Sequence, residues 1–595
     1  MTAPNRNTLW ASILVDELVA GGVRSVCLAP GSRSTPLTVA FATHPNVETF
    51  SHLDERSAAF FALGRGRRMG TPTPIVCTSG TAAANVHPAV MEANEGSVPL
   101  LVLTADRPPE LWESGANQTT DQVRLYGDAV RWYRSLPEPA PEPRTLRSLR
   151  VTVARALSSS TGTPPGPVHL NVPFRKPLEP TAVPDDVPTD LAVRAPEAMT
   201  GRDGPYVRSH GGIMHPDNGT VDAVAMRLDR ATRGLLVCGP TAGSDLDPAV
   251  IVSLATATGF PILADPLSGL RFGSHVPERT DADGSARPTI CGGYDSYLAG
   301  VDWPKPDVVI RFGASPTSKV LRQYLARTAS TQFLIDPAGG WEEATFTATD
   351  HVTASPTPFV EGVLDRLGEQ TVGETTVRYS ERFATAEQRY WEVVDSERPD
   401  RDFEGSILRE VCRRCPSPAT LFVSNSMPVR DLDRFGQPRA GDITALGNRG
   451  VSGVDGIVST ALGAGSATDD PLVLVTGDIA YYHDMNGLLA LDRCGVEATI
   501  VVIDNDGGGI FHMLPIEAFD PPFTEQFLTP HGLDFAPTGD LYDLDFERFD
   551  ALDPFCEAFE ASVERAGTQV LCLSVDGEAS HRAREALHER VCESI

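Results

Sequence analysis

Two turns in the C-terminal third of the sequence carry side-chain oxygen atoms of the kind that bind a divalent cation. Such a cation can in turn bind the phosphate groups of a ligand. Gly477 and Asp478 follow an expected buried strand, and Asn505 follows the next one. The carboxyl ends of neighbouring parallel strands meet at one edge of a sheet, where α/β proteins bind their ligands. The carboxylate of Asp478, the amide oxygen of Asn505 and the carbonyl of Gly507 would supply three ligands to Mg2+ or Mn2+, with water and phosphate oxygens completing the shell.

The elements around these turns would hold the phosphate. We expect strands at 472–475 and 499–503, with one helix at 479–493 between them. The amide groups of the first helical turn, including that of Ile479, favour an anion. The glycines at 507–509 let the backbone approach it closely. Gly-Asp and Asn-Asp-Gly are also ordinary turn sequences, but two such turns at matching strand ends are much less expected by chance.

A glutamate in the N-terminal third is placed to exchange a proton. Glu55 follows a short expected strand and begins an apolar helix of small residues that includes Ala58 and Ala59. We expect its carboxyl to be buried there. Taken alone, the pair Asp54-Glu55 would be explained by the preference of acidic residues for a helix N-terminus. Beside the two turns described above, a catalytic role is the better explanation.

Four arginines stand in turns after expected strands. They are Arg33, Arg107, Arg430 and Arg449. A guanidinium group binds a carboxylate through paired hydrogen bonds, so four of them around one cleft predict substrates rich in carboxylates. Any one of them taken singly would be explained by a surface ion pair.

The composition excludes several classes of protein. The net charge of −29 disfavours a nucleic-acid binder, because phosphate requires a basic surface. The sequence has no run of about 18 apolar residues, so we expect no membrane span. We expect a cytoplasmic, reduced protein without a secretory signal. Its only lysines are Lys176, Lys305 and Lys319, and such an acidic, lysine-poor chain suits a halophilic cytoplasm in which salt screens the repulsion.

Some motifs are set aside. Cys412 and Cys415 form a CxxC without a second pair of ligands, so we interpret them as helix residues and not as a zinc site. Gly64 and Gly66 have the wrong spacing for a dinucleotide-binding turn. No role is assigned to the histidines near the motifs, which are His52, His87, His483, His512 and His531.

The elements that must position these residues form three groups. In each group, short β-branched segments alternate with amphipathic segments, which is typical of an α/β fold with a doubly wound parallel sheet covered on both faces. We expect domains at 1–180, 218–375 and 376–595, with a Pro-rich linker at 181–217.

The Gly477-Asp478 and Asn505 pattern resembles the diphosphate-binding motif of thiamine diphosphate enzymes. That superfamily also has a glutamate on a separate domain, as Glu55 is here, which hydrogen-bonds the aminopyrimidine of the cofactor. The resemblance implies a pyrimidine-binding first domain, a middle scaffold domain and a third domain for diphosphate and Mg2+. It further implies a homodimer or a dimer of dimers with active sites at the subunit interface.

Five further motifs extend the resemblance from the superfamily to one family within it. They are Pro30-Gly31-Ser32-Arg33-Ser34-Thr35-Pro36, Thr104-Ala105-Asp106-Arg107-Pro108-Pro109-Glu110, Gly115-Ala116-Asn117-Gln118, Asn425-Ser426-Met427-Pro428-Val429-Arg430 and Gly447-Asn448-Arg449-Gly450-Val451-Ser452-Gly453-Val454-Asp455-Gly456. Together they look like the family of 2-succinyl-5-enolpyruvyl-6-hydroxy-3-cyclohexene-1-carboxylate (SEPHCHC) synthases of menaquinone biosynthesis. Those transferases decarboxylate 2-oxoglutarate on thiamine diphosphate and add the resulting succinyl carbanion equivalent to isochorismate, releasing CO2.

The resemblance carries roles onto individual residues. The cofactor and its metal ion would contact Glu55, Val454, Gly477, Asp478, Ile479, Asn505, Gly507, Gly509 and Ile510. The succinyl carboxylate would contact Ser426, Arg430 and Arg449. Isochorismate would contact Ser32, Arg33, Arg107, Asn117, Gln118 and Lys319, and Phe511 would wall the reaction centre with Ile510. Family members often have arginine after this lysine, whereas this chain has Val320, and Arg322 is a possible replacement.

Two other functions stay open. One is a different thiamine diphosphate carboligase or decarboxylase, of the acetolactate synthase type, which acts on pyruvate and needs fewer arginines. The other is a non-catalytic protein whose middle domain binds a nucleotide at 237–243 as a sensor. The joint presence of Glu55, Asp478 and Asn505 argues against the second.

Overall fold

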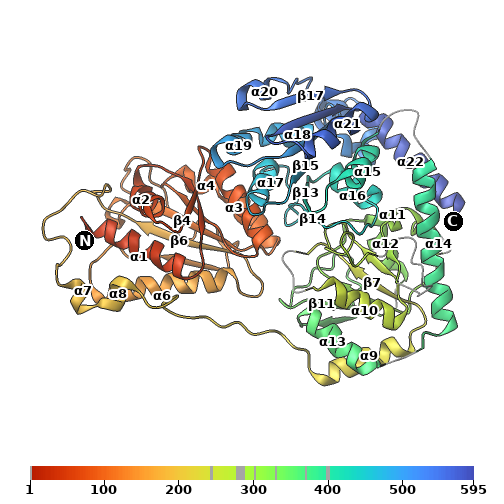
Figure 1. Ribbon diagram of the computed structural model, residues 1–595, viewed down its shortest axis with the longest axis horizontal. Helices are drawn as coiled ribbons and strands as arrows, with labels where there is room; N and C mark the ends of the chain where they lie inside the picture. The colour runs from red at the N-terminus through yellow and green to blue at the C-terminus, as the bar shows by residue number, and fades with distance from the viewer. Residues whose placement is uncertain are drawn as a thin grey trace. The chain divides into compact units, whose positions relative to one another are not determined.

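The computed structural model describes residues 3–241, 246–276, 288–300, 303–328, 331–368, 371–396 and 403–595. These residues contain three six-stranded sheets in which neighbouring strands are parallel, with helices in the connections (Figure 1). The predicted α/β class with three doubly wound sheets is confirmed. Strands covered on both faces are apolar along their length, as in β4, Leu100–Asp106, where all seven residues are buried.

The first sheet has the strand order β2-β1-β3-β4-β6-β5. Its strands are β1 Ser25–Ala29, β2 Glu48–Ser51, β3 Pro74–Cys77, β4 Leu100–Asp106, β5 Trp132–Ser135 and β6 Pro167–Pro173. The helices are α1 Arg6–Ala20, α2 Thr35–Thr43, α3 Glu55–Met69, α4 Thr81–Asn85, α5 His87–Glu95 and α6 Pro143–Ser160, with single turns at η1 Ser32–Ser34 and η2 Pro109–Leu111. The chain order reverses direction between β1 and β3, which makes their carboxyl ends the expected binding edge.

The second sheet has the order β12-β11-β10-β7-β8-β9. Its strands are β7 Gly234–Cys238, β8 Ile262–Ala264, β9 Ile290–Cys291, β10 Val308–Phe312, β11 Gln332–Ile335 and β12 Asp350–Val352. The helices are α9 Asn218–Arg230, α10 Pro248–Thr258, α11 Tyr294–Tyr297, α12 Lys319–Thr328 and α13 Pro356–Leu367. The long helix α14 Glu374–Ser396 follows.

The third sheet has the order β14-β13-β15-β16-β18-β17. Its strands are β13 Ala419–Val423, β14 Ile443–Leu446, β15 Leu472–Gly477, β16 Thr499–Asp504, β17 Asp545–Phe549 and β18 Gln569–Ser574. The helices are α15 Glu404–Arg414, α16 Met427–Phe435, α17 Ile457–Gly465, α18 Asp478–His483, α19 Leu489–Cys494, α20 Pro537–Tyr542, α21 Leu552–Val563 and α22 Gly577–Ser594. Short turns lie at η3 Met485–Leu488, η4 Gly509–Met513, η5 Pro515–Ala518 and η6 Phe523–Leu528.

The single helix expected over 479–493 is wrong. Helix α18 ends at His483, and η3 and α19 follow as separate pieces. Asp484 interrupts the helix with a φ of −121°, and its buried carboxylate accepts the backbone N–H of Ser459 at 2.7 Å. A side chain that bonds the backbone of another segment competes with helix continuation, which explains the break.

The chain divides into two compact units. Unit 1 comprises Met1–Gly212, Asn448–Asp469 and His483–Val496, and unit 2 comprises Ile213–Gly447, Asp470–Tyr482 and Glu497–Ile595. Unit 1 therefore combines the first sheet with α17 and α19, which come from the C-terminal part of the sequence. The pattern of strands and helices did not indicate this grouping.

The segment expected as a linker, 181–217, contains two short helices, α7 Leu191–Arg194 and α8 Pro196–Thr200. Its buried residues Leu191, Ala195 and Ala198 join the hydrophobic cluster formed by α1 and α6. Among the described helices of the chain, none combines the length and the apolar character needed to cross a bilayer.

Candidate active site

In unit 2, the predicted metal-binding residues lie at one edge of the third sheet. Asp478 follows β15 and Asn505 follows β16, and these two strands are neighbours. Ser426 follows β13, which flanks β15 on its other side. The sheet order reverses between β13 and β15, so all three residues lie around the switch point where α/β sheets bind ligands.

Asp478 is a buried carboxylate at the start of α18. Its Oδ1 accepts the N–H of Ile479 at 2.7 Å, and its Oδ2 accepts the N–H of Gly507 at 3.0 Å. Burial raises the pKa of Asp478 to about 6, and these two backbone donors partly oppose that effect. A desolvated carboxylate of this kind fits next to a cation.

Asn505 follows the neighbouring strand and offers an amide oxygen as the second proposed ligand. Its Nδ2 donates to Oε1 of Glu404 at 2.6 Å. Its Oδ1 is buried and finds no hydrogen-bond donor within the described part of the chain. Buried polar atoms are normally paired, so an unpaired amide oxygen at the end of the strand next to Asp478 fits a divalent cation as the missing partner.

The glycines after β16 are required by the backbone. Gly507 has a φ of +147°, and a Cβ there would lie 2.1 Å from the carbonyl oxygen of Leu528. A Cβ on Gly509 would lie 2.6 Å from Nδ2 of Asn505. Only glycine lets the loop follow this course. Gly477, just before Asp478, has open space around its Cβ position, which suits an approaching ligand.

His531 is a neighbour of Asp478 to which the sequence analysis assigned no role. The N–H of Leu533 donates to its Nδ1 at 3.0 Å, so that nitrogen is an acceptor and the proton of the neutral ring is on Nε2. Nε2 lies 3.2 Å from Oδ2 of Asp478 and donates to it. His531 therefore orients the carboxylate.

Asp504 is also near, because its carboxylate, that of Asp478 and a ring nitrogen of His531 have ligand atoms within 4.8 Å of one another. Nη1 of Arg548 donates to Oδ2 of Asp504 at 2.9 Å, however. An arginine already neutralises that carboxylate. Asp478, Asn505 and Gly507 therefore remain the better set for a cation.

Two of the three residues predicted to bind the succinyl carboxylate, Ser426 and Arg430, lie at the start of helix α16. Ser426 has a φ of +67°, an unusual value for a residue other than glycine. Nη1 of Arg430 donates to the carbonyl oxygen of Ser426 at 2.5 Å. Backbone strain of this kind persists where the surrounding structure enforces it, and it concentrates at functional sites.

The predicted wall of the reaction centre also lies in unit 2. Ile510 and Phe511 belong to η4, directly after the glycines, and both are half-buried, as is Ile479. The ring of Phe511 packs edge-on against Phe527 with their centroids 5.3 Å apart.

In unit 1, a second set of predicted residues lies at one edge of the first sheet. Ser32 and Arg33 follow β1, Glu55 lies after β2, and Arg107 follows β4. These strands are parallel and separated only by β3, so their carboxyl ends share this edge.

Glu55 is the first residue of α3, as predicted, but its carboxyl is not buried within one chain. The residue is half-buried, and Nδ2 of Asn85 donates to its Oε2 at 3.3 Å. The expected burial is wrong for the single chain, in which Glu55 is only half-buried.

Arg33 and Arg107 are electrostatic neighbours in unit 1. Nη1 of Arg33 donates to the carbonyl oxygen of Phe174 at 2.6 Å. Burial lowers the pKa of Arg33 to about 10, with a further contribution from the positive charge of Arg107. The carboxylate of Asp106 acts in the opposite direction on the pKa of Arg33 and accepts the backbone N–H of Arg107 at 2.7 Å.

The loop after Arg107 carries two more predicted residues. Nη2 of Arg107 donates to the carbonyl oxygen of Asn117 at 2.8 Å. Gln118 adopts a φ of +54°, and its Nε2 donates to the carbonyl oxygen of Ser79 at 3.2 Å. Ser32, Asn117 and Gln118 are exposed in the single chain, so their side chains are accessible to a ligand.

A buried polar network beneath this loop was missed by the sequence analysis. Nε2 of Gln122 donates to Oδ1 of Asn171 at 2.9 Å, and Nδ2 of Asn171 donates to Asp106 at 2.8 Å. Oε1 of Gln122 accepts the N–H of Gly80 at 3.0 Å. The network ties the loops after β3 and β4 together. The polar residues Thr104, Asp106, His169 and Asn171 within these buried strands were a signal for it.

Several predicted partners fall in different units. Arg449 and Val454 are half-buried in unit 1, whereas Ser426 and Arg430 belong to unit 2. Glu55 and Asp478 are divided in the same way. The meeting of these residues in one site therefore stays a prediction.

Lys319 is exposed at the start of α12. Val320 packs against the hydrophobic core of unit 2. Nε of Arg322 donates to the carbonyl oxygen of Ser318 at 3.3 Å, so its guanidinium is turned back onto its own helix.

The motifs that were set aside have structural explanations. Cys412 lies in α15 and Cys415 caps it, and both are packed in the hydrophobic core. Burial raises the pKa of Cys415 to about 12, so it is an inert thiol. His52 is buried against Phe61 and has its pKa lowered by burial to about 4, which fits a neutral core residue.

In the second sheet, the strand order reverses between β7 and β10, and the loops after these two strands contact each other in the described residues. The N–H of Ala314, after β10, donates to the carbonyl oxygen of Pro240, after β7, at 2.9 Å. A Cβ on Gly239 would lie 1.8 Å from the carbonyl oxygen of Ala314. The two loops are thus in direct contact at this switch point. Residues 242 and 243 of the proposed sensor segment lie outside the described residues.

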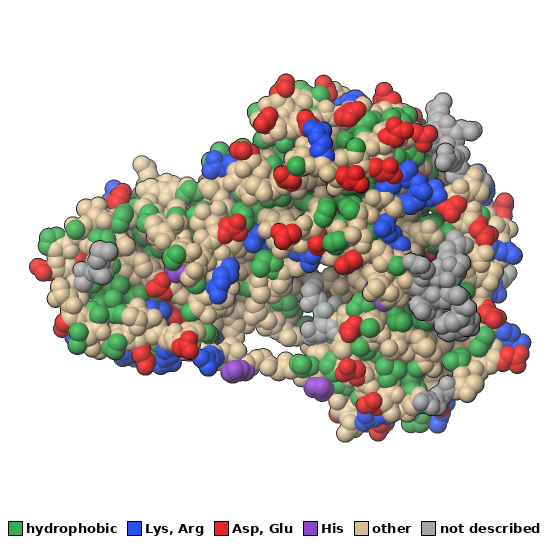
Figure 2. All heavy atoms as spheres, in the orientation of Figure 1, with side chains coloured by type: hydrophobic (Ala, Val, Ile, Leu, Met, Phe, Trp, Pro, Cys, Tyr) green, Lys and Arg blue, Asp and Glu red, His purple; other side chains and the backbone are tan. Residues whose placement is uncertain are grey.

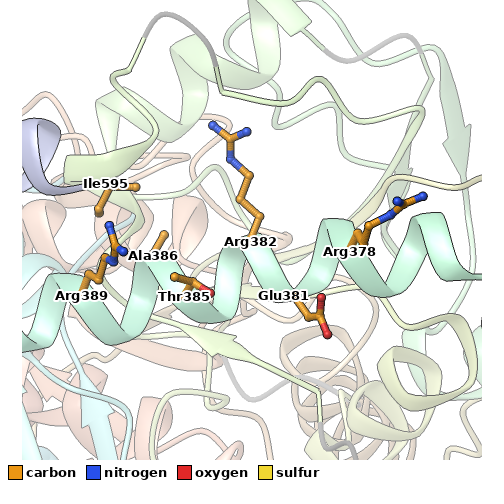
Figure 3. Close-up of a pocket in the computed structure, with 7 residues that line it drawn as sticks. All are labelled: Arg378, Glu381, Arg382, Thr385, Ala386, Arg389 and Ile595. Atoms are coloured by element: carbon orange, nitrogen blue, oxygen red, sulfur yellow. The ribbon is translucent and has the colours of Figure 1, made fainter.

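A shallow groove along α14 is not a convergent site. It is lined by Arg378, Glu381, Arg382, Thr385, Ala386, Arg389 and Ile595. Figure 3 shows its three arginines, Arg378, Arg382 and Arg389, separated along the helix. Arg382 stacks over Trp303 at 5.0 Å, and Arg389 donates to the carbonyl oxygen of Ser594 at 2.6 Å. These cations are engaged locally.

Comparison with known proteins first defines the class. The family described as "Thiamine pyrophosphate enzyme, N-terminal TPP binding domain" matches residues 10–125. The solved structure of benzoylformate decarboxylase from Polynucleobacter necessarius is similar with a TM-score of 0.68 at 17% identity, covering 96% of this chain and 99% of that one. The fold is that of thiamine diphosphate enzymes.

Curated relatives then define the family. A 2-succinyl-5-enolpyruvyl-6-hydroxy-3-cyclohexene-1-carboxylate synthase from Haloarcula marismortui is 61% identical over 100% of both chains. Relatives with the same name come from Halobacterium salinarum, 57% identical over 99% of both, and from Roseiflexus castenholzii, 46% identical over 98% of both. The chain belongs to the SEPHCHC synthase family.

Proposed function

We propose that this chain is a transferase that decarboxylates 2-oxoglutarate on thiamine diphosphate and adds the succinyl unit to isochorismate, releasing CO2. The observation that carries the proposal is the position of the family's residues at the carboxyl ends of adjacent strands in two sheets. Full-length similarity to SEPHCHC synthases supports it.

Asp478, Asn505 and Gly507 would hold Mg2+ or Mn2+ through one carboxylate, one amide and one carbonyl oxygen. Gly477, Ile479, Gly509, Ile510 and Val454 would surround the cofactor. When bound, thiamine diphosphate supplies the electron sink that allows CO2 to leave. We assign the diphosphate end to 376–595, the pyrimidine end to 1–180 and a scaffold role to 218–375.

Side chains of this protein would transfer the proton and neutralise the charges of the substrates. Glu55 would share a proton with the aminopyrimidine of the cofactor, and Phe511 would exclude water from the reacting atoms. The arginines would neutralise substrate carboxylates through paired hydrogen bonds. Ser426, Arg430 and Arg449 would hold the succinyl carboxylate, and Ser32, Arg33, Arg107, Asn117, Gln118 and Lys319 would hold isochorismate.

The test is a reaction mixture of protein, thiamine diphosphate, Mg2+, 2-oxoglutarate and isochorismate in molar salt. We expect CO2 release and an adduct whose mass equals the two substrates less CO2. Omitting isochorismate should abolish the adduct. Turnover of pyruvate with no reaction of 2-oxoglutarate would instead support the acetolactate synthase type.

We also propose that Glu55 and Asp478 meet across the interface of a homodimer or a dimer of dimers. Glu55 is only half-buried in one chain, which fits a carboxyl that a second copy completes. Glu55→Gln and Asp478→Ala should each be inactive. Unfolded together and refolded as a mixture, they should regain about a quarter of normal activity, because half of the dimers carry one intact site. If the mixture stays inactive while the wild type refolds to activity, the shared site is refuted.

A further inference from the structure

A buried cluster of charged side chains in unit 2 connects to the proposed metal site but belongs to none of the motifs. It consists of Glu404 at the start of α15, Asp431 in α16 and Arg584 in α22. Their exposed fractions are 1%, 0% and 4%. Three charges removed from water in this way are expensive to bury, so the cluster calls for an explanation beyond stability.

The contacts of the cluster lead to Asn505. Nε and Nη2 of Arg584 donate to the two carboxylate oxygens of Asp431, each at 2.7 Å. Nη2 of Arg584 also donates to Oε2 of Glu404. Oε1 of Glu404 accepts Nδ2 of Asn505 at 2.6 Å. A continuous chain of charge-assisted hydrogen bonds therefore runs from α16 and α22 to the loop after β16.

This chain of contacts decides which way the Asn505 amide points. An amide has a donating and an accepting end, whereas the two oxygens of the Glu404 carboxylate accept, one from Arg584 and one from Asn505. Glu404 therefore holds the NH2 end, and Oδ1 must face the opposite side. That oxygen is buried and unpaired within the described residues. Arg584 in turn holds the other oxygen of the Glu404 carboxylate through a hydrogen bond.

We propose that Glu404, held by Arg584 and Asp431, is a positioning residue that turns the amide oxygen of Asn505 toward the divalent cation. The inference rests on the proposed metal site. Second-layer partners of this kind orient metal ligands, and their loss typically weakens metal binding about 10–100-fold. The α22 helix, which supplies Arg584, is thereby coupled to cofactor binding.

The experiment measures binding of Mn2+ to the full-length protein with thiamine diphosphate, by electron paramagnetic resonance and calorimetry. In Glu404→Gln, the carbonyl end of the new amide will face Arg584, so its NH2 end faces Asn505. The Asn505 amide must then reverse and offer NH2 to the metal. We expect Mn2+ affinity to fall about 10–100-fold, with far-UV circular dichroism and melting without cofactor near those of the wild type.

A compensating variant separates positioning from general damage. In the double variant Glu404→Gln with Asn505→Asp, one carboxylate oxygen can accept from Gln and the other can bind the metal. We expect Mn2+ affinity to recover by at least about tenfold over Glu404→Gln. If the double variant folds and shows no recovery, the orientation argument is wrong. Asp431→Asn should weaken Mn2+ binding in the same direction as Glu404→Gln.

Asp433→Asn is the matched control. Asp433 lies on the same helix as Asp431 and is equally buried, but it pairs with Arg271 at 2.9 Å. This variant should leave Mn2+ affinity within about threefold of the wild type. Wild-type Mn2+ affinity in Glu404→Gln would overturn the inference. Absence of Mn2+ binding in the wild type would refute the proposed metal site itself.

Discussion

Glu55 has fewer contacts within one chain than Asp478, the residue proposed to bind the metal ion. It is half-buried, and the described contact of its carboxylate is Asn85 at 3.3 Å. Asp478, in contrast, is buried and receives three hydrogen-bond donors. The end of the site proposed to exchange a proton is therefore less complete in one chain than the end proposed to bind the metal ion.

Glu55→Gln should lower carboligation by at least about 100-fold, because positioned general acids and bases contribute roughly 10²–10⁴-fold. Thiamine diphosphate binding, measured by calorimetry, should be largely kept, since Asp478 and Asn505 are intact. Glu48→Gln, an exposed glutamate on the preceding strand, is the control and should retain activity. Unchanged turnover in Glu55→Gln would refute the catalytic role.

The buried His169 side chain predicts how the stability of the protein depends on pH. It is buried beside Thr104, with Nε2 2.7 Å from Oγ1 of Thr104, and burial lowers its pKa to about 3. Below about pH 6.5 the unfolded chain binds a proton that the folded chain does not, so stability falls as the pH drops.

Between pH 7.5 and 5.5, the wild type should lose about 1.4 kcal/mol more stability than His169→Gln. Denaturant unfolding at constant salt measures the difference. Equal losses in both proteins would show that His169 is protonated in the folded state.

At the scale of elements, unit 1 depends on the close crossing of α3 and α17. A Cβ on Gly64 would lie 1.9 Å from the carbonyl oxygen of Thr460, and a Cβ on Gly463 would lie 2.0 Å from that of Phe61. Nη1 of Arg65 donates to the carbonyl oxygen of Ser466 at 2.7 Å. Gly64, which does not belong to a dinucleotide-binding turn, thus allows the two helices to pack closely.

Gly64→Ala should destabilise the protein by about 1–3 kcal/mol or more, because the backbone of α17 must move to admit a methyl group. Thermal or denaturant unfolding measures this. Gly162→Ala is the control, since its Cβ would have its nearest neighbour at 3.4 Å, an ordinary contact. A Gly64→Ala protein as stable as the control would contradict the close crossing.

At the scale of the whole molecule, the acidic charge dominates. The net charge is −29 and the chain has three lysines. Figure 2 shows Asp and Glu side chains spread over the visible face and not gathered in one patch. Repulsion among such charges opposes folding unless salt screens it.

Dialysis from molar salt to about 0.1 M should therefore lower the melting temperature by several degrees and reduce activity, because the screening length grows from about 3 to 10 Å. Calorimetry across a KCl series checks this. Asp553→Asn with Glu557→Gln, which neutralises two exposed carboxylates of α21, should lessen the dependence. A protein fully folded and active at low salt would exclude the halophilic interpretation.

Much of the architecture was predictable because it depends on local patterns. Apolar β-branched runs alternating with helices indicated three parallel sheets, and strand-end turns placed Ser426, Asp478 and Asn505 at one edge. The helix break at Asp484 was not predictable, since it depends on a bond to Ser459, 25 residues away.

The amino-acid sequence by itself determined the fold class, the acidic surface and the family motifs, since all three follow from residue types and spacing. Only the tertiary structure decided that Glu404 orients Asn505 from 101 residues away, that Gln122 and Asn171 join two loops, and that α17 packs on α3. Those contacts arise where distant segments meet in a packed interior, and no local pattern records which segments will meet.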